Sequence, residues 1–292
     1  MTFIFPVQTD LKPILKFEAT RVFSYSIIQE IQALVKRLFL QVWRRPATLM
    51  AGIIQPLLWL VLFGGLFYNT PVNLFTINTT YNCFLSSGII IFTSFTGALN
   101  SGLPLMFDRE FGFLNRLLTA PLISRSSIIF SSAVFMTCIS LIQVIFIVIA
   151  SLFMGNSSLP LNATLIFCVI ILLITVGVTM LSLALAFTLP GHIELLALIL
   201  VVNLPFLFSS TALAPLYFMP PWLQLIASLN PLSYAIEGVR YLYYSSVNWN
   251  FTESVIRISW GEISLGQIII LLVILDLIGA YIVSNILKAK LN

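Results

Sequence analysis

Charged residues are so widely spaced in this chain that long apolar stretches separate them. No Asp, Glu, Lys or Arg occurs in residues 46–107, 126–193 or 195–236. A final apolar run covers residues 264–287 and is interrupted only by Asp276. A membrane-spanning helix needs about 20 apolar residues. The first two stretches can therefore each hold two spans and a loop, and the third can hold one span and a further apolar segment.

Polar residues, glycines and prolines divide these stretches into six expected helices. Composition agrees, since 59% of the 292 residues are apolar, 8% are charged and the mean hydropathy is +1.05. A soluble domain carries roughly 25% charged residues, and a disordered chain needs low hydropathy and high charge. The sequence thus predicts an all-α integral membrane protein and excludes a soluble enzyme of this size. The six expected transmembrane helices cover residues about 46–68, 81–106, 128–154, 162–188, 194–213 and 264–287.

The positions of Lys and Arg predict which side of the membrane each loop occupies. Seven basic residues lie in residues 1–45, three in 107–127 and two in the C-terminal tail, against two in 214–263. Both termini are therefore expected on the cytoplasmic or stromal side, with 12 basic residues there and 2 on the other side. The net charge of +4 follows from this topology and suits contact with anionic membrane lipid. It does not indicate nucleic acid as a partner, because the sequence has no soluble basic domain.

An amphipathic helix is expected directly before the first span. Apolar residues between Ile27 and Val42 recur every three to four positions, with polar residues on the other face. The helix ends at Trp43-Arg44-Arg45, which suits a headgroup boundary. Two interpretations stay open: an anchor on the membrane surface alone, or an anchor that also packs against a cytoplasmic partner. The chain accordingly divides into an N-terminal segment, 1–45, and a single transmembrane domain, 46–292.

The loop after the second expected span carries a cluster of charges among apolar residues. A short amphipathic helix is predicted over about 108–118, because acids stand at its start, Arg116 near its end and Pro121 beyond it. Such a helix can insert into a groove on a soluble partner, or it can be a connector that lies on the lipid surface. The candidate contact residues are Asp108, Arg109, Glu110, Phe111, Gly112, Leu114, Arg116 and Leu117.

The segment 214–246 is apolar but is interrupted by four prolines. It is too broken for a clean span and too apolar for an aqueous loop. We therefore expect a re-entrant or interfacial pair of short helices before the last span. Within it, Glu237 and Arg240 have i,i+3 spacing, which favours a local ion pair on one helix face.

Polar residues inside the expected spans are few. Asp276 is the one acid deep in a span, where a charge costs about 2.5–3.5 kcal/mol on insertion scales. It either lines a translocation path or a subunit contact, or it is a hydrogen-bonded acid inside the bundle. Asn100, Gln143 and Asn203 are path-lining candidates on polarity alone. The three cysteines have no metal-ligand spacing, and the single histidine, His192, is expected as a turn residue.

Two segments resemble a known family. Arg-Glu-Phe-Gly at 109–112 and Arg-Leu-Leu-Thr-Ala-Pro at 116–121, followed by Ser124-Arg125, are similar to the loop between spans two and three of ABC-2-type transporter permeases. Residues 230–240 contain Asn-Pro, an aromatic residue, and then Glu and Arg, and they resemble that family's signature between its fifth and sixth spans. The two segments occur in the right order among the expected spans.

The resemblance implies a six-helix permease that pairs with a second copy or with a related chain. In the family, the loop equivalent to 108–118 forms a coupling helix that docks on a separate ATP-binding subunit. ATP and Mg²⁺ would then bind to that partner, and no cofactor to this chain. The sequence has no Gly-Lys pair and hence no Walker A phosphate loop. The implied function is the membrane subunit of an ATP-driven exporter that is not itself an enzyme.

The low charge, the composition and the lack of a presequence resemble plastid-encoded algal members of the family, with a bacterial inner-membrane protein as the alternative. Two other functions stay open. An ion-coupled secondary transporter would need internal repeats and more intramembrane charges than Asp276. A membrane-embedded enzyme or assembly factor would need a cluster of His, Asp or Glu near one membrane face. The sequence shows neither feature, and no motif in it selects a substrate.

Overall fold

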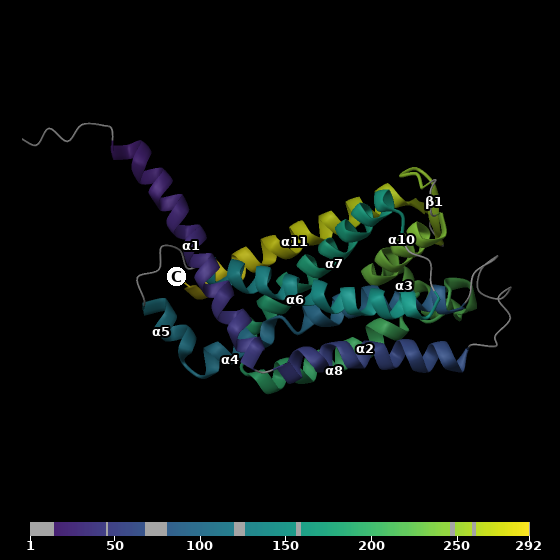
Figure 1. The fold of residues 1–292 in the computed structure, drawn as a ribbon, viewed down its shortest axis with the longest axis horizontal. Helices are drawn as coiled ribbons and strands as arrows, with labels where there is room; N and C mark the ends of the chain where they lie inside the picture. The colour runs from purple at the N-terminus through teal and green to yellow at the C-terminus, as the bar shows by residue number, and fades with distance from the viewer. Residues whose placement is uncertain are drawn as a thin grey trace, which may run out of the picture.

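The computed structural model describes residues 15–44, 46–67, 81–119, 126–155, 159–245, 249–258 and 261–291. Part of the expected N-terminal segment, residues 1–14 and Arg45, lies outside the described residues. So do the expected loop 69–80 and the end of the charged loop, 120–125, with Pro121. Most of the described chain is helical, and the long helices run side by side along the long axis of the molecule (Figure 1).

Five helices in the described residues are long and apolar enough to cross a membrane. Each lies where an uncharged stretch predicted a span. A long apolar segment forms a helix in hydrocarbon because the helix satisfies all of its backbone hydrogen bonds internally. The helices are α2 (Pro46–Leu66), α3 (Tyr81–Leu99) with its extension α4 (Gly102–Glu110), α6 (Ser126–Phe153), α7 (Leu161–Thr188) and α11 (Leu265–Leu291).

The remaining expected span, 194–213, is shorter in the structure. Helix α8 (His192–Phe208) is apolar but has only 17 residues. Its length is about 26 Å, against about 30 Å for the hydrocarbon core of a bilayer. The chain leaves the helix after Phe208 and continues in turns. Of the six expected spans, five therefore meet the length of a membrane crossing, and α8 stands in the place of the other.

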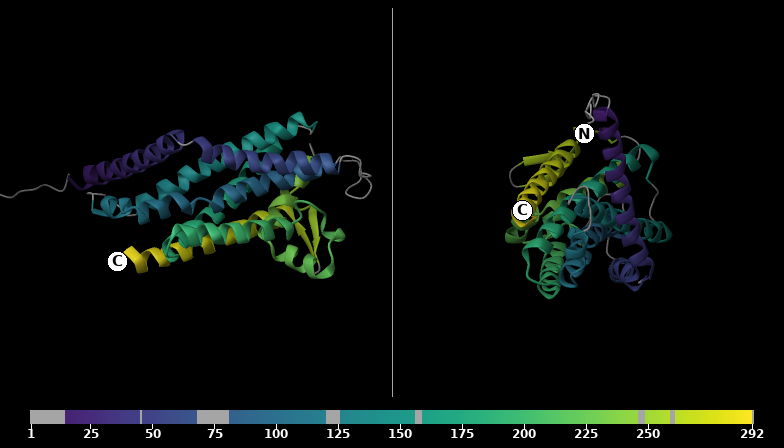
Figure 2. Two further views of the ribbon diagram at one scale, coloured as in Figure 1. Left: turned by 90° about the horizontal axis from the view of Figure 1, so that it is seen from below. Right: turned by 90° about the vertical axis from the view of Figure 1, so that its left-hand side faces the viewer.

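Helix α3 forms the centre of the bundle. It packs against α2, α6, α7 and α10, and side chains such as Phe84 and Phe92 are fully buried. Small residues let helices approach closely, and hydroxyls bind across the contacts. Ser94 Oγ lies 2.6 Å from Thr175 Oγ1 of α7, and Ser140 Oγ of α6 donates to the Ser94 carbonyl over 3.1 Å. In contrast, α2 and α11 lie on opposite sides of the bundle, and few of their residues are buried (Figure 2).

The two ends of the bundle carry different elements. Helix α1 (Leu15–Arg44), helix α5 (Phe113–Thr119) and the C-terminal end of α11 lie at one end, which we name the α5 end (Figures 1 and 2). Helix α10 (Pro231–Ser245) lies at the other, the α10 end. The sequence predicted that the N-terminal segment, the charged loop and the C-terminal tail share one side of a membrane. The structure places the described parts of all three at one end.

The helix predicted over 108–118 is divided, so its continuity was predicted wrongly. Helix α4 ends at Glu110, and α5 begins at Phe113. Gly112 between them has a φ of 72°, the left-handed conformation in which many helices end and which glycine adopts without a steric penalty. Its N–H donates to Arg109 O over 3.3 Å. Helix α5 therefore leaves α4 in a new direction (Figure 1).

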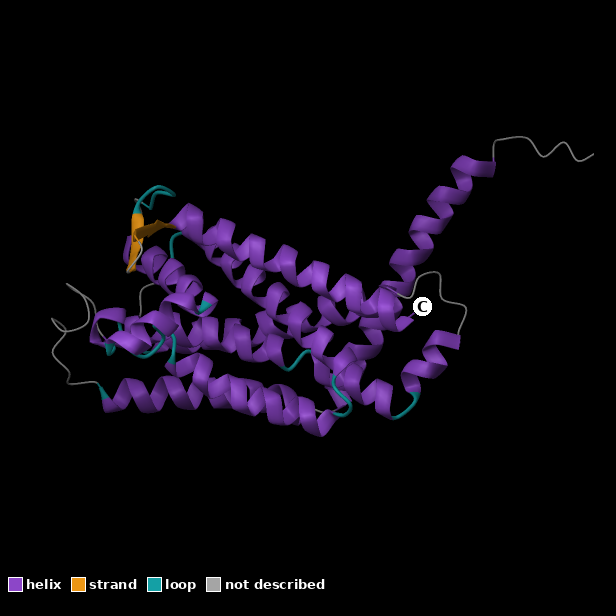
Figure 3. Cartoon of the chain, turned by 180° about the vertical axis from the view of Figure 1, so that it is seen from behind, coloured by secondary structure: helices purple, strands orange, loops and turns teal. Residues whose placement is uncertain are grey.

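The proline-rich segment 214–246 forms three helical pieces where a pair was expected: η2 (Leu216–Phe218), α9 (Pro221–Leu229) and α10. The helices α9 and α10 each begin with proline, which fits a first helical position because no N–H is needed there. An antiparallel pair of strands, β1 (Ser254–Ile258) and β2 (Gly261–Ser264), follows at the same end and was not predicted (Figure 3).

Candidate functional site

Three consecutive residues at the C-terminal end of α4 bind three different elements at the α5 end. The first, Asp108, forms an ion pair with Arg37 of α1. The Arg37 guanidinium also lies 4.3 Å from the ring centroid of Phe113 in α5, which is a cation–π distance. Helices α1, α4 and α5 are thus joined through one arginine.

The second residue, Arg109, binds the C-terminal end of α7. Its Nη1 donates to Ala186 O over 2.8 Å, and its Nη2 donates to Leu189 O and Pro190 O over 2.5 and 2.7 Å. The last four carbonyls of a helix have no partner within the helix, and α7 has no basic residue in its last turn. Arg109 supplies both the donors and the positive charge that this helix end favours.

The third residue, Glu110, binds the first residue of α8. Its Oε1 accepts a hydrogen bond from His192 N–H over 2.5 Å, and its Oε2 pairs with His192 Nδ1. A Cβ on Gly191 would lie 2.9 Å from Glu110 Oε1, so the glycine makes room for the carboxylate. The His192 ring also contacts Phe107, with centroids 5.1 Å apart. His192 is therefore a partner of the charged loop, which its position after a Pro-Gly pair did not reveal.

The rest of the charged loop has one buried and one outward face. Phe111 is 77% exposed, and Arg116 is exposed on α5. We predicted the candidate contact residues from the sequence as one set. The structure divides them into side chains that face outward and side chains that bind within the chain. An aromatic and a cationic side chain face outward, and Gly112 forms the turn. The side chains that bind or pack within the chain are Asp108, Arg109, Glu110, Leu114 and Leu117.

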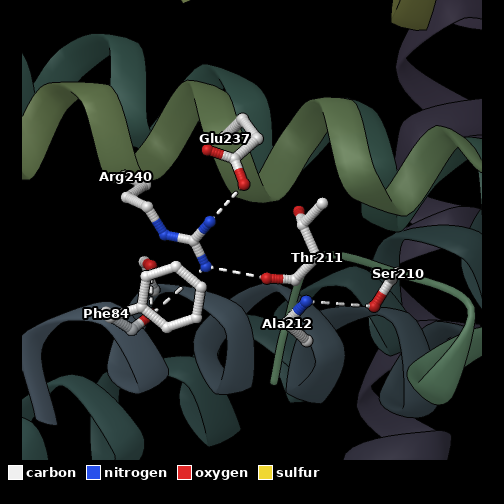
Figure 4. A network of polar contacts seen from close by, with 7 residues as sticks. Phe84, Ser210, Thr211, Ala212, Glu237 and Arg240 are labelled. Atoms are coloured by element: carbon white, nitrogen blue, oxygen red, sulfur yellow. Dashed lines mark hydrogen bonds and ion pairs between the residues drawn. The ribbon is translucent and has the colours of Figure 1, made fainter. Parts of the chain in front are cut away.

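A second polar cluster lies at the α10 end, around Arg240 (Figure 4). Arg240 is 3% exposed and pairs with Glu237 of the same helix. Its Nη2 donates to Thr211 O over 2.8 Å and to Phe84 O over 3.3 Å. The guanidinium lies 3.6 Å from the Phe84 ring centroid. The expected ion pair is present, and it belongs to a buried contact between α10, α3 and the turn after α8.

Asn230, the residue before α10, binds the same turn. Its Nδ2 donates to Phe206 O over 3.1 Å and to Ser209 O over 3.4 Å, and its Oδ1 accepts from Leu232 N–H over 3.0 Å. The side chain therefore joins the end of α8 to the start of α10. Asn230 thus satisfies Phe206 O, one of the last carbonyls of α8, and Arg240 binds Thr211 O in the turn that follows.

Asp276 lies where α11 packs against α7. It is half-buried, and a Cβ on Gly177 of α7 would collide with its carboxylate. Within the described residues it forms no hydrogen bond or ion pair. The residues on either side of it along α11, Leu275 and Leu277, are exposed. The carboxyl therefore sits at a contact between helices close to the outer surface of the bundle.

The three amide side chains named from polarity bind or pack within the bundle. Asn100 Nδ2 donates to Thr96 O over 2.8 Å, and Thr96 Oγ1 donates to Asn203 Oδ1 over 3.1 Å. Gln143 of α6 is 5% exposed and lies against Gly97 of α3. Asn203 therefore joins α8 to α3 and Gln143 lies between α6 and α3, whereas the bond of Asn100 stays within the end of α3.

The fold and these contacts define a polytopic helical membrane protein. Its clusters of charged residues lie at the two ends of the bundle, and its spans are apolar. Residues 29–244 match the ABC-2 type transporter family. The chain belongs to this family, and the resemblance noted in residues 109–125 and 230–240 is confirmed.

Relatives that carry the name "Putative transport permease ycf38" match nearly the whole chain. The proteins of the red algae Porphyra purpurea and Pyropia yezoensis are 85% identical over 292 residues and 84% identical over 285, which is 100% and 98% of both chains. A protein of Cyanophora paradoxa is 52% identical over 272 residues, or 93% of both chains. The similarity to these proteins therefore includes α11, which lies beyond the family match.

Proposed function

We propose that this chain is the membrane-spanning permease subunit of an ATP-driven exporter. Membership of the ABC-2 family supports a permease role. Since the sequence has no Gly-Lys phosphate loop, ATP would be bound with Mg²⁺ and hydrolysed by a separate nucleotide-binding subunit. The observation that carries the proposal is the outward face of the charged loop at the α5 end.

The proposed docking surface on this face consists of Phe111 and Arg116. Phe111 is 77% exposed although it is a large aromatic residue, and Arg116 is exposed on the adjacent α5. Aromatic and arginine side chains contribute a large share of the energy at protein contacts. Because α5 lies at the end of the bundle, a soluble subunit can reach it without entering the membrane (Figure 1).

A second permease chain, identical or related, would complete the transporter. Asn100, Gln143 and Asn203 bind or pack within one subunit, which favours a translocation path between subunits over one through the middle of this bundle. Few residues of α2 and α11 are buried, and either lipid or a second chain can cover their accessible apolar surface. Asp276 lies at the contact between α11 and α7, next to exposed residues of α11, so a subunit contact is a proposed role for it.

A plastid membrane is the proposed location, with both termini on the stromal side. The red algal relatives support this location. The side is supported by the excess of basic residues in the N-terminal segment, the charged loop and the tail. The described parts of these segments share the α5 end, so the ATP-binding subunit would also lie on the stromal side.

Co-purification of an ATP-hydrolysing chain with the tagged permease from its own membranes tests the proposal. Phe111→Ala and Arg116→Gln should each weaken the association, by about 2 kcal/mol or roughly 30-fold in affinity if they are central contacts. The measurement is the ATPase activity recovered per permease, with the ATPase chain identified by mass spectrometry.

Two matched controls make the same chemical changes elsewhere. Phe153→Ala removes an aromatic ring that is 87% exposed at the far end of α6, and Arg257→Gln removes a cation that is 84% exposed on β1. Both should leave the recovered ATPase unchanged. Recovery of no ATPase with the wild-type permease, or equal losses in the controls, would contradict the proposal.

A further inference from the structure

The turn between α7 and α8 caps its two helix ends only in part: Leu189 N–H and Thr188 Oγ1 donate to Leu185 O in the last turn of α7. Helix α7 ends at Thr188 without a basic residue in its last turn. Helix α8 begins at His192 after Gly191, which makes no side-chain cap. Helix ends leave carbonyls or N–H groups without helical partners, and inside a protein these groups are normally satisfied by capping side chains or water.

Further partners for these two helix ends come from α4. Arg109 donates to Ala186 O in the last turn of α7 and to Leu189 O and Pro190 O directly after it. The next residue, Glu110, accepts from the first N–H of α8. The order of the two charges matches the two helix dipoles, since the carbonyl end favours a cation and the N–H end favours an anion. The reverse order, Glu before Arg, would place each charge at the wrong helix end.

The C-terminal end of α8 is held by two further side chains. Asn230 binds Phe206 O in the last turn of α8 and Ser209 O after it. Arg240 binds Thr211 O in the turn that follows. Helix α8 packs against α4, and its later residues contact α3, where Thr96 Oγ1 donates to Asn203 Oδ1 and the ring of Phe206 stacks on a phenylalanine. A displacement of α4 along its axis would therefore move α8, and α8 would move the turn that Arg240 binds at the α10 end.

We infer that Arg109 and Glu110 form a clamp that makes α8 follow α4 when a partner displaces α5. They are positioning residues: the outward Phe111 and Arg116 receive the partner, and the clamp passes the movement to α8. The clamp itself follows from the contacts of this chain, whereas its use in transport rests on the proposed function.

The first experiment tests the clamp on the purified permease alone, without any partner. Arg109→Gln, Glu110→Gln and the swapped pair Arg109→Glu with Glu110→Arg should each speed hydrogen exchange in peptides that cover residues 185–196. An increase of about tenfold is expected, as for a lost helix cap. Glu262→Gln on β2 is the matched control and should leave these peptides unchanged. Unchanged exchange in all three variants would overturn the clamp.

The second experiment separates docking from transmission. In a chain with Cys83, Cys138 and Cys168 changed to Ser, Phe208→Cys reports on the far end of α8 through its rate of maleimide labelling. With the ATPase subunit bound, adding ATP should change this rate severalfold. Arg109→Gln should retain the bound ATPase and lose the change in labelling, whereas Arg116→Gln should lose the ATPase.

The outcomes distinguish the two proposals. If no ATPase binds the wild-type chain, the proposed function fails, while the exchange experiment still decides on the clamp. If Arg109→Gln loses the ATPase as fully as Arg116→Gln does, Arg109 belongs to the docking surface and the inference is overturned. If labelling still responds to ATP in Arg109→Gln, the clamp does not transmit the movement.

Discussion

The guanidinium of Arg240 in α10 lies 3.6 Å from the ring centroid of Phe84 in α3, 156 positions earlier in the chain. The same guanidinium pairs with Glu237 and donates to Thr211 O over 2.8 Å. Two distant helices and one turn therefore depend on one buried cation. Such a contact is sensitive to the loss of either charge, because the remaining charge is left buried and unpaired.

Replacing the buried arginine should destabilise the permease strongly. Arg240→Ala leaves Glu237 without its partner and Thr211 O without its donor, so the free energy of unfolding should fall by about 3 kcal/mol or more. Arg240→Lys keeps the charge but not the planar fork, so the free energy of unfolding should fall less in this variant. Thermal unfolding in lipid nanodiscs measures both, with Arg257→Gln as an exposed control. Equal stability of Arg240→Ala and the control would show that the cluster contributes little.

Gly88 of α3 should tolerate no side chain. A Cβ there would lie 2.5 Å from Ala212 O and 2.7 Å from Ala212 Cα, and both are backbone atoms that cannot rotate away. Gly88→Ala should lower the free energy of unfolding by about 1–3 kcal/mol, as overpacked cores do.

The matched glycine is Gly65 in α2, whose added Cβ would meet nothing within 4 Å. Gly65→Ala should raise stability by about 0.5–1 kcal/mol, because alanine favours the helix. The same unfolding assay compares both variants. If Gly88→Ala were as stable as Gly65→Ala, α3 and the turn after α8 would not approach as closely as the structure shows.

Asp276 and Gly177 should be coupled in a double-mutant cycle. Gly177→Ala should destabilise the permease, since the new Cβ collides with the Asp276 carboxylate. In an Asp276→Ala background the same change should be close to neutral. The expected interaction energy is about 0.5–3 kcal/mol, the range for residues in contact. Additive effects would show that the carboxylate points away from Gly177.

The backbone conformation of Gly112 should affect how strongly the docking surface binds the ATPase. Its φ of 72° favours glycine, and its surroundings leave space for a Cβ. Gly112→Ala should therefore act through strain of about 1–2 kcal/mol and not through a clash. We expect a severalfold loss of co-purified ATPase in Gly112→Ala and a smaller loss in Gly112→Asn, which tolerates this region better. Equal recovery in all three chains would show that the angle between α4 and α5 does not matter for docking.

The spans could be predicted from the sequence because an uncharged apolar run of this length has few alternatives to a membrane helix. The stretch 126–193 held α6 and α7 as expected. The early end of α8 was missed because the residues that follow it, such as Ala212, are buried by protein instead of lipid. Hydropathy does not distinguish these two kinds of burial.

The polar contacts could be predicted only in part, because most of their acceptors are backbone carbonyls. The residues that Arg109 binds lie 77 to 81 positions away, and every residue has a carbonyl, so no side chain marks them. The i,i+3 spacing did predict the pair of Glu237 and Arg240, but an exposed and a buried pair have the same spacing. One signal for the clamp did exist: a Pro-Gly turn between two apolar helices offers few side chains for capping, so partners from elsewhere are favoured there.

Because α8 is short, the stability of this permease should depend on the thickness of its membrane. A helix of 17 residues that is shorter than the hydrocarbon core places its terminal peptide groups where thick bilayers have no water. At the α10 end, Asn230 supplies Phe206 O of this helix with a partner from the protein. In a bilayer of short acyl chains, water and headgroups could do the same. Asn230 therefore matters more as lipid tails lengthen, and hydrophobic mismatch around α8 sets how much it contributes.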